Sequence, residues 1–155
     1  MSIMTNVVLK EPCIDYLNAC GDKQCYDMIC SDSWKIVDLD LVHMKKSDVN
    51  FSATFKLKFK QSTTASAIIT WFDCKFENFK NPITLRTSPY APYTHWKNTI
   101  FYIDRANYVK EGETLTGSIA VRQGKENHRE IDVKMSFHFS NLLESQAQIQ
   151  LYKVR

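Results

Sequence analysis

Glycine is scarce in this chain of 155 residues, which has only Gly21, Gly112, Gly117 and Gly124. No two of these glycines are close enough to form a G-x-G loop, which excludes a nucleotide-binding turn of the usual kind. No apolar run approaches the roughly 20 residues that a membrane-spanning helix needs. The first ten residues also lack the basic end and long apolar centre of a signal peptide. These absences predict a soluble intracellular protein with no membrane partner.

Strong charge of one sign is also missing, since 20 basic and 17 acidic residues leave a net charge of +3. This balance predicts no nucleic-acid partner, because such a partner needs basic residues gathered on one face. Lys56, Lys58 and Lys60 alternate with apolar residues and are interpreted as the solvent side of a strand. The five cysteines are odd in number and lack the C-x2-C spacing of zinc sites. We therefore expect free thiols and no metal.

From residue 34 onwards the chain has a two-residue apolar period, which is typical of half-buried strands. Residues 37–43 and 51–59 both alternate in this way, and the second run is the cleaner of the two. Further strands are predicted at 65–76, 82–85, 99–103, 114–121, 131–139 and 147–154. The links 110–113 and 123–127 have hairpin chemistry, in which glycine supplies a positive φ.

The N-terminal part has a different pattern. Residues 2–10 predict a short helix with Ser2 as a fair N-cap, and residues 13–33 predict an irregular connection. The expected fold class is therefore all-β: an antiparallel β-barrel or sandwich of about eight or more strands with a short N-terminal helical segment.

One loop combines a stiff backbone with side chains that can do chemistry. Pro89 and Pro92 exclude a helix, and the β-branched and aromatic residues 99–103 that follow favour a strand. Four consecutive residues with reactive or aromatic side chains lie at this junction: Tyr93, Thr94, His95 and Trp96. Loops held by a scaffold in this way often carry function, so this loop is the candidate site.

Each of these side chains also has a plainer structural interpretation. A lone histidine is a weak signal, and His95 could be satisfied by a local backbone group. Trp96 could pack in the core or offer its ring to a guanidinium, and the residues alone leave both open. The hydroxyl of Thr94 is predicted to fix the loop.

The segment S-P-Y-A-P-Y-T-H-W, residues 88–96, resembles the Thr-His-Trp loop of the protein arginine methyltransferases. Similar matches continue, in order and at similar spacing, at W-F-D-C-K-F (71–76), V-K-E-G-E (109–113), T-G-S-I (116–119) and N-H-R-E-I-D (127–132). Residues 1–12 resemble the end of the family's dimerisation arm. Within the family the chain looks most similar to the type I branch.

This resemblance implies that the chain is the C-terminal, substrate-binding β-barrel of an enzyme. Such an enzyme transfers methyl groups from S-adenosylmethionine to arginine guanidinium nitrogens of proteins such as histones and Arg-Gly-rich proteins. Residues 1–33 are then a remnant of the dimerisation arm with a connecting segment, and residues 34–155 are the barrel. The family's cofactor domain, with its Gly-rich loop and two catalytic glutamates, is absent from this sequence, so the chain alone is expected to be inactive.

The resemblance also implies roles and partners. His95 would support catalysis by pairing with an acidic residue of the cofactor domain of the same chain. Tyr93, Thr94 and Trp96 would bind substrate at the arginine pocket, and no residue here would bind cofactor or metal. The complete enzyme would be a homodimer of the cytoplasm and nucleus that acts on arginine-containing proteins. The alternative is a stand-alone, non-catalytic β-barrel that binds other proteins, and fold alone does not separate the two.

Overall fold

The computed structural model describes residues 9–15, 28–92, 94–143 and 146–155, and these contain ten β-strands and one short 3-10 helix. The chain divides into two compact units. The first comprises Met1–Glu11, Cys30–Ala65 and Ala106–Arg155, and the second comprises Pro12–Ile29 and Ser66–Arg105. A search of the described residues finds no helix long and apolar enough to cross a membrane.

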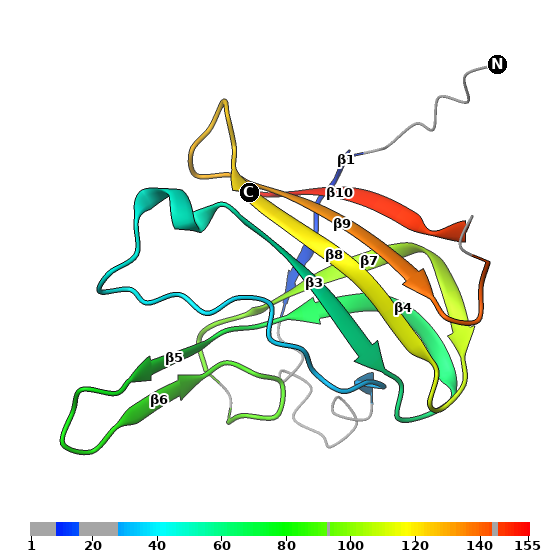
Figure 1. Ribbon diagram of the computed structural model, residues 1–155, viewed down its shortest axis with the longest axis horizontal. Helices are drawn as coiled ribbons and strands as arrows, with labels where there is room; N and C mark the ends of the chain where they lie inside the picture. Colours follow the sequence, from blue (N-terminus) through cyan, green and yellow to red (C-terminus); the bar gives the residue numbers. More distant parts are fainter. Residues whose placement is uncertain (1–8, 16–27, 93, 144–145) are drawn as a thin grey trace. The chain divides into compact units, whose positions relative to one another are not determined.

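The first unit is built on a five-stranded sheet with the order β1-β10-β9-β8-β3 (Figure 1). Its strands are β1 (Leu9–Lys10), β3 (Phe51–Lys58), β8 (Thr114–Gln123), β9 (Ile131–Phe139) and β10 (Gln148–Val154). The pairings are antiparallel except that β1 runs parallel to β10. The 3-10 helix η3 (Lys46–Val49) lies just before β3.

One face of this sheet carries the buried core of the first unit. Its buried side chains include Phe55, Leu115, Ile119, Val133, Met135, Phe137, Phe139 and Tyr152. Gly117 of β8 is required by close approach, because a Cβ there would lie 2.6 Å from the ring of Phe55 and against the carbonyl oxygen of Ser136. The ring of Phe59 stacks on Phe139 with centroids 6.3 Å apart.

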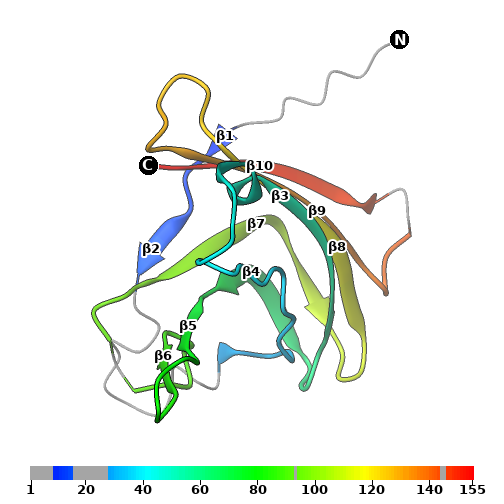
Figure 2. The same cartoon turned by 60° about the vertical axis from the view of Figure 1, so that its left-hand side comes forward.

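The second unit contains the pairing of β2 (Cys13–Asp15) with β7 (Asn98–Val109), and β7 also pairs with β4 (Thr63–Thr70). Both β4 and β7 continue into the first unit. The strands β5 (Asp73–Phe76) and β6 (Ile83–Arg86) form a separate antiparallel hairpin, which follows β4 along the chain (Figure 2). Phe101 and Ile103 of β7 are buried.

The predicted all-β, antiparallel fold class is confirmed, and every strand predicted after residue 50 has a counterpart. The alternation over 51–59 and 131–139 places Phe55, Phe137 and Phe139 inward, as their spacing predicts. The long strand predicted at 65–76 is instead two strands, β4 and β5, separated at residues 71–72.

The strand predicted at 37–43 is wrong. This segment is a loop in which Leu41 is 69% and Val42 is 78% exposed. Asp40 turns the backbone, because its carboxylate accepts the N–H of Val42 at 3.0 Å and its carbonyl accepts the N–H of Met44 at 2.8 Å. Such local bonds to an aspartate compete with a sheet ladder, so the alternation alone did not make a strand.

Two N-terminal predictions also change. Residues 2–8 of the predicted helix lie outside the described residues, whereas Leu9–Lys10 form β1 instead of a helix. Cys13–Asp15, predicted as irregular, form β2. The division into residues 1–33 and 34–155 stays a prediction, although β1 and β2 in its first part pair with β10 and β7.

The two glycine turns differ from each other. Gly112 has the predicted positive φ, at 86°. Gly124 has no positive φ. Glycine is needed there because the backbone of Asn127 comes close, and a Cβ at position 124 would lie 2.6 Å from the carbonyl oxygen of Asn127.

Candidate functional site

The loop between β6 and β7 is anchored at its first residue by Thr87, which is 4% exposed. The Thr87 hydroxyl donates to the carbonyl oxygen of Phe72 at 2.7 Å and accepts the N–H of Phe72 at 3.1 Å. The N–H of Thr87 also donates to that carbonyl, at 3.2 Å. These bonds extend the β5–β6 pairing by one residue beyond Asp73 and Arg86. The loop therefore starts from a fixed point.

The same residue holds the other end of the loop. Asn98 begins β7 and is 3% exposed, and its side-chain amide donates to the carbonyl oxygen of Thr87 at 2.9 Å. Between the two ends, Pro89 and Ala91 are buried, and the N–H of Ala91 donates to the carbonyl of Ser88 at 3.0 Å. A buried polar network of this kind rigidifies the backbone that it joins.

Trp96 stands exposed on this anchored loop. The residue is 51% exposed, and its ring meets the ring of Phe72 edge-on, with centroids 5.6 Å apart and an interplanar angle of 77°. The ring of His95 also meets it edge-on, at 5.4 Å and 83°. Edge-to-face pairs at such distances are favourable, so Phe72 and His95 orient the indole while much of it stays accessible.

The structure brings together three of the four residues predicted for this site. His95 and Trp96 are exposed and in contact, which places neither in a buried core. Thr94 is half-buried, and its hydroxyl accepts the N–H of Trp96 at 3.3 Å and donates to the Trp96 carbonyl at 3.4 Å. These long bonds agree with the predicted loop-fixing use of the hydroxyl. Tyr93 lies outside the described residues.

Three residues that support the loop were missed by sequence reasoning: Phe72, Thr87 and Asn98. Phe72 fell inside the strand predicted at 65–76, and no role was predicted for it. Asn98 carried no signal, because it precedes the strand predicted at 99–103 and has the phase of the exposed Tyr102 rather than that of the buried Phe101 and Ile103. Thr87 carried none either, since β-branched polar residues are ordinary at strand ends.

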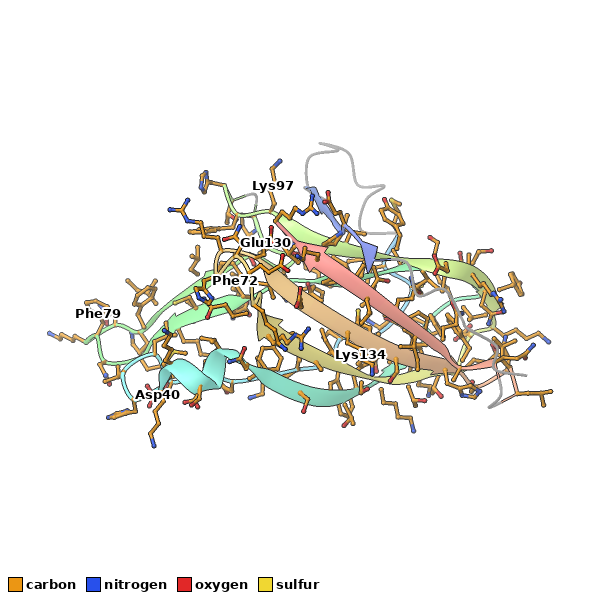
Figure 3. All side chains as sticks on the ribbon, turned by 90° about the horizontal axis from the view of Figure 1, so that it is seen from above. Asp40, Phe72, Phe79, Lys97, Glu130 and Lys134 are labelled. Carbon is orange, nitrogen blue, oxygen red and sulfur yellow. The ribbon has the colours of Figure 1, made fainter. Side chains whose placement is uncertain are left out.

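The surface of the second unit is rich in exposed large apolar side chains. They include Phe72, Phe76, Phe79, Ile83, Tyr90 and Trp96, each at least 44% exposed. The rings of Phe76 and Phe79 are in contact, with centroids 6.2 Å apart. Phe79 belongs to the loop that connects β5 and β6 (Figure 3 labels Phe72 and Phe79). An extended apolar surface of this kind usually marks an interaction site.

Metal and nucleotide chemistry have little support in the described residues. No group of three or more His, Cys, Asp or Glu side chains there could hold a metal ion. Cys30 and Cys74 are free thiols, and burial raises the pKa of Cys30. Gly112 and Gly124 lie in turns and Gly117 lies within β8, so none of these glycines opens a nucleotide loop.

Comparison with known proteins assigns this arrangement to a family. The sequence profile described as "Arginine methyltransferase oligomerization subdomain" matches residues 1–142. Protein arginine N-methyltransferase 1 of Schizosaccharomyces pombe is 35% identical over 133 residues, which cover 86% of this chain and 37% of that protein. The protein of the same name in Caenorhabditis elegans is 34% identical over 139 residues, which cover 90% of this chain and 38% of that protein.

Solved structures agree on the fold. The Trypanosoma brucei PRMT1 enzyme-prozyme heterotetrameric complex with AdoHcy matches with a TM-score of 0.82 at 24% identity, covering 94% of this chain and 44% of that one. Arabidopsis thaliana protein arginine methyltransferase 10 matches with a TM-score of 0.80 at 18% identity, covering 95% and 43%.

The chain is thus an all-β domain of the barrel or sandwich type found in the C-terminal part of arginine methyltransferases. It belongs to the protein arginine methyltransferase family and corresponds to the oligomerization subdomain. The chain spans about two fifths of the length of the curated relatives named above, at 37% and 38%.

Proposed function

We propose that this chain is the C-terminal β-barrel part of an S-adenosylmethionine-dependent protein arginine N-methyltransferase of type I. In the full-length enzyme it forms one wall of the arginine pocket and of the peptide groove. The observation that carries the proposal is the exposed Trp96, oriented by Phe72 and His95 on a loop whose two ends are tied to Thr87. Membership of the family supplies the reaction.

The loop's contribution is to position the substrate arginine. A guanidinium stacks on an aromatic face, gaining of order 0.5–2 kcal/mol according to how fully it is desolvated. Trp96 offers such a ring at the end of a rigid loop, and in this proposal Tyr93 and Thr94 also bind the substrate. His95 is exposed beside it, where its imidazole can pair with an acidic residue of the cofactor domain. Positioning of this kind supports catalysis by holding the nucleophile in a reactive geometry.

S-adenosylmethionine belongs to the rest of the full-length enzyme in this proposal. The glycines of the chain lie too far apart for a cofactor loop, and the described ones serve turns and a strand. This chain's own residues therefore do not fit the cofactor, and the chain alone is inactive. Its exposed apolar surface around Phe72 and Trp96 suits cover by the cofactor domain and the substrate peptide.

The partners follow from the same assignment. The full-length enzyme is a homodimer that methylates arginine-containing proteins such as histones and Arg-Gly-rich proteins, in the cytoplasm and nucleus. The matched profile describes an oligomerization subdomain, and the trypanosomal neighbour is a heterotetramer, which supports an oligomeric assembly.

The test compares this chain with the full-length enzyme that contains it. Calorimetric titration with S-adenosylmethionine should show no micromolar binding to the chain alone, and an Arg-Gly-rich peptide should stay unmethylated. The full-length enzyme should bind the cofactor and methylate the peptide. A full-length protein that binds no cofactor would favour the stand-alone binding module. If the 155-residue chain methylates the peptide by itself, the proposal that the cofactor is bound outside this chain is wrong.

A further inference from the structure

The outward face of the five-stranded sheet carries an uneven distribution of charge. Its basic side chains are Lys56, Lys58, Arg122, Lys134 and Lys153, and its acids are Asp132 and the adjoining Glu130. Five basic and two acidic side chains give this surface a net charge of +3. We call it the lysine face (Figure 3 labels Lys134 and Glu130).

Both acids near the lysine face are already paired. Asp132 accepts from the guanidinium of Arg122 at 3.1 Å, and Glu130 lies 2.8 Å from the ammonium of Lys153. Lys56 and Lys134 form no ion pair with any described residue. Lys58 is partly offset by Asp32, whose carboxylate accepts its backbone N–H at 2.8 Å. The uncompensated charge is thus centred on Lys56 and Lys134.

Short hydroxyl side chains separate these two lysines. Lys56 lies opposite Thr116, and Lys134 lies opposite Ala120. Between these rows, Thr54, Ser118 and Ser136 stand side by side on three adjacent strands, with the Ser118 and Ser136 hydroxyls 2.7 Å apart. A ligand can therefore approach the sheet closely between the two ammonium groups. The backbone positions of Lys56 and Lys134 are two strands and four residues apart in the sheet. This corresponds to roughly 16 Å, the length of about five residues of extended peptide.

An apolar border runs along β10 beside these residues. Ile149 pairs with Ser136 and is 56% exposed, and the half-buried Leu151 pairs with Lys134. Aromatic residues are absent from the outward positions of β3, β8 and β9. Single-stranded nucleic acids are usually held by aromatic stacking platforms, so this face favours a protein partner.

We propose that the lysine face binds an extended, acidic segment of a partner protein that also carries apolar side chains. Its carboxylates pair with Lys56 and Lys134, and its apolar side chains contact Ile149 and Leu151. This surface lies wholly within the first unit, and its binding does not depend on methyltransferase activity. The proposal therefore stands or fails separately from the proposed function.

The probe is a labelled octapeptide of six glutamates and two leucines, measured by fluorescence anisotropy with the 155-residue chain. We expect binding at low salt that weakens near physiological ionic strength, where the screening length is about 8 Å. The double variant Lys56→Glu plus Lys134→Glu should lower the association constant on the order of tenfold, because it replaces two attractions by repulsions. Lys134→Gln should give a smaller loss of the same sign.

The matched control is Lys75→Glu plus Lys80→Glu, which makes the same change in net charge on exposed lysines of the second unit. Thermal melting of each variant confirms that it is folded. The proposal is overturned if the peptide does not bind at low salt, or if the control variant weakens binding equally. It is also overturned if a labelled oligouridylate of equal charge binds more tightly than the peptide. Self-association that the Lys56 and Lys134 double variant abolishes would assign the face to a second copy of the chain instead.

Discussion

Substitution of Thr87 by valine tests whether the candidate loop is held in place by a side chain. Valine keeps the shape of threonine but removes the hydroxyl that bonds to both the N–H and the carbonyl of Phe72. Each hydrogen bond contributes about 0.5–1.5 kcal/mol net, so the variant should lose about 1–3 kcal/mol of unfolding free energy. For a domain of this size the melting temperature should then fall by about 2–12 °C.

The assay is thermal melting of the 155-residue chain, together with the NMR signal of the Trp96 indole. Thr54→Val is the matched control, because Thr54 lies on the exposed face of β3 and its loss should cost within about 0.5 kcal/mol. The indole signal of Trp96 should shift in Thr87→Val and not in Thr54→Val, since Phe72 carries both the lost bonds and the ring that meets Trp96. Equal melting of Thr87→Val and the wild type, with an unshifted indole, would refute this account of the anchor.

Three further predictions concern His95, the Glu130–Lys153 pair and Tyr152. His95→Ala should leave the melting temperature of the chain nearly unchanged, whereas turnover of the full-length enzyme falls; unfolding by His95→Ala would show it to be a core residue. The hydrogen bond with Lys153 lowers the pKa of Glu130 and raises that of Lys153, so the stability that Glu130→Gln removes should be present between about pH 4.5 and 10.5. The wild type should therefore melt at a higher temperature than Glu130→Gln within this range. The difference should shrink below about pH 4.5, where Glu130 protonates, and above about pH 10.5, where Lys153 deprotonates. A difference that is constant from pH 3 to 11 contradicts the pairing. Burial raises the pKa of Tyr152 to about 12, so phenolate absorbance should show one tyrosine ionising late, and Tyr152→Phe should remove part of the stability loss between about pH 10 and 12.

The sheet of the first unit could be predicted from sequence because its own side chains enforce the pattern. Phe55 and Phe137 alternate with polar residues along their strands, β9 pairs with the strands before and after it, and Gly112 marks the turn between β7 and β8. The segment 37–43 has the same alternation but pairs with no strand in the part of the chain that the structure describes, and Asp40 supplies local hydrogen bonds instead. Periodicity reports which residues favour a pleated surface, whereas pairing depends on what lies beside them.

The candidate loop was predicted from its prolines and from its resemblance to a family. The residues that hold it in place, Phe72, Thr87 and Asn98, were not predicted. Thr87 and Phe72 are 15 residues apart in sequence and meet only because β5 and β6 pair. Contacts of that range depend on the register of the hairpin, which the sequence alone left open. The same limit hid the lysine face, since Lys56 and Lys134 lie on strands that become neighbours of β8 only in the folded sheet.

The most direct test of the central claim is the kcat/KM of the full-length enzyme for an Arg-Gly-rich peptide, compared between Trp96→Ala and Trp34→Ala. Trp96 and Trp34 are equally exposed, at 51% and 50%, but only Trp96 lies on the candidate loop. Loss of a guanidinium contact of about 0.5–2 kcal/mol predicts a decrease of roughly 2- to 30-fold for Trp96→Ala. Trp34→Ala should leave kcat/KM nearly unchanged. Equal activity of the two variants, with both proteins folded, would contradict the assignment of this loop to the arginine site.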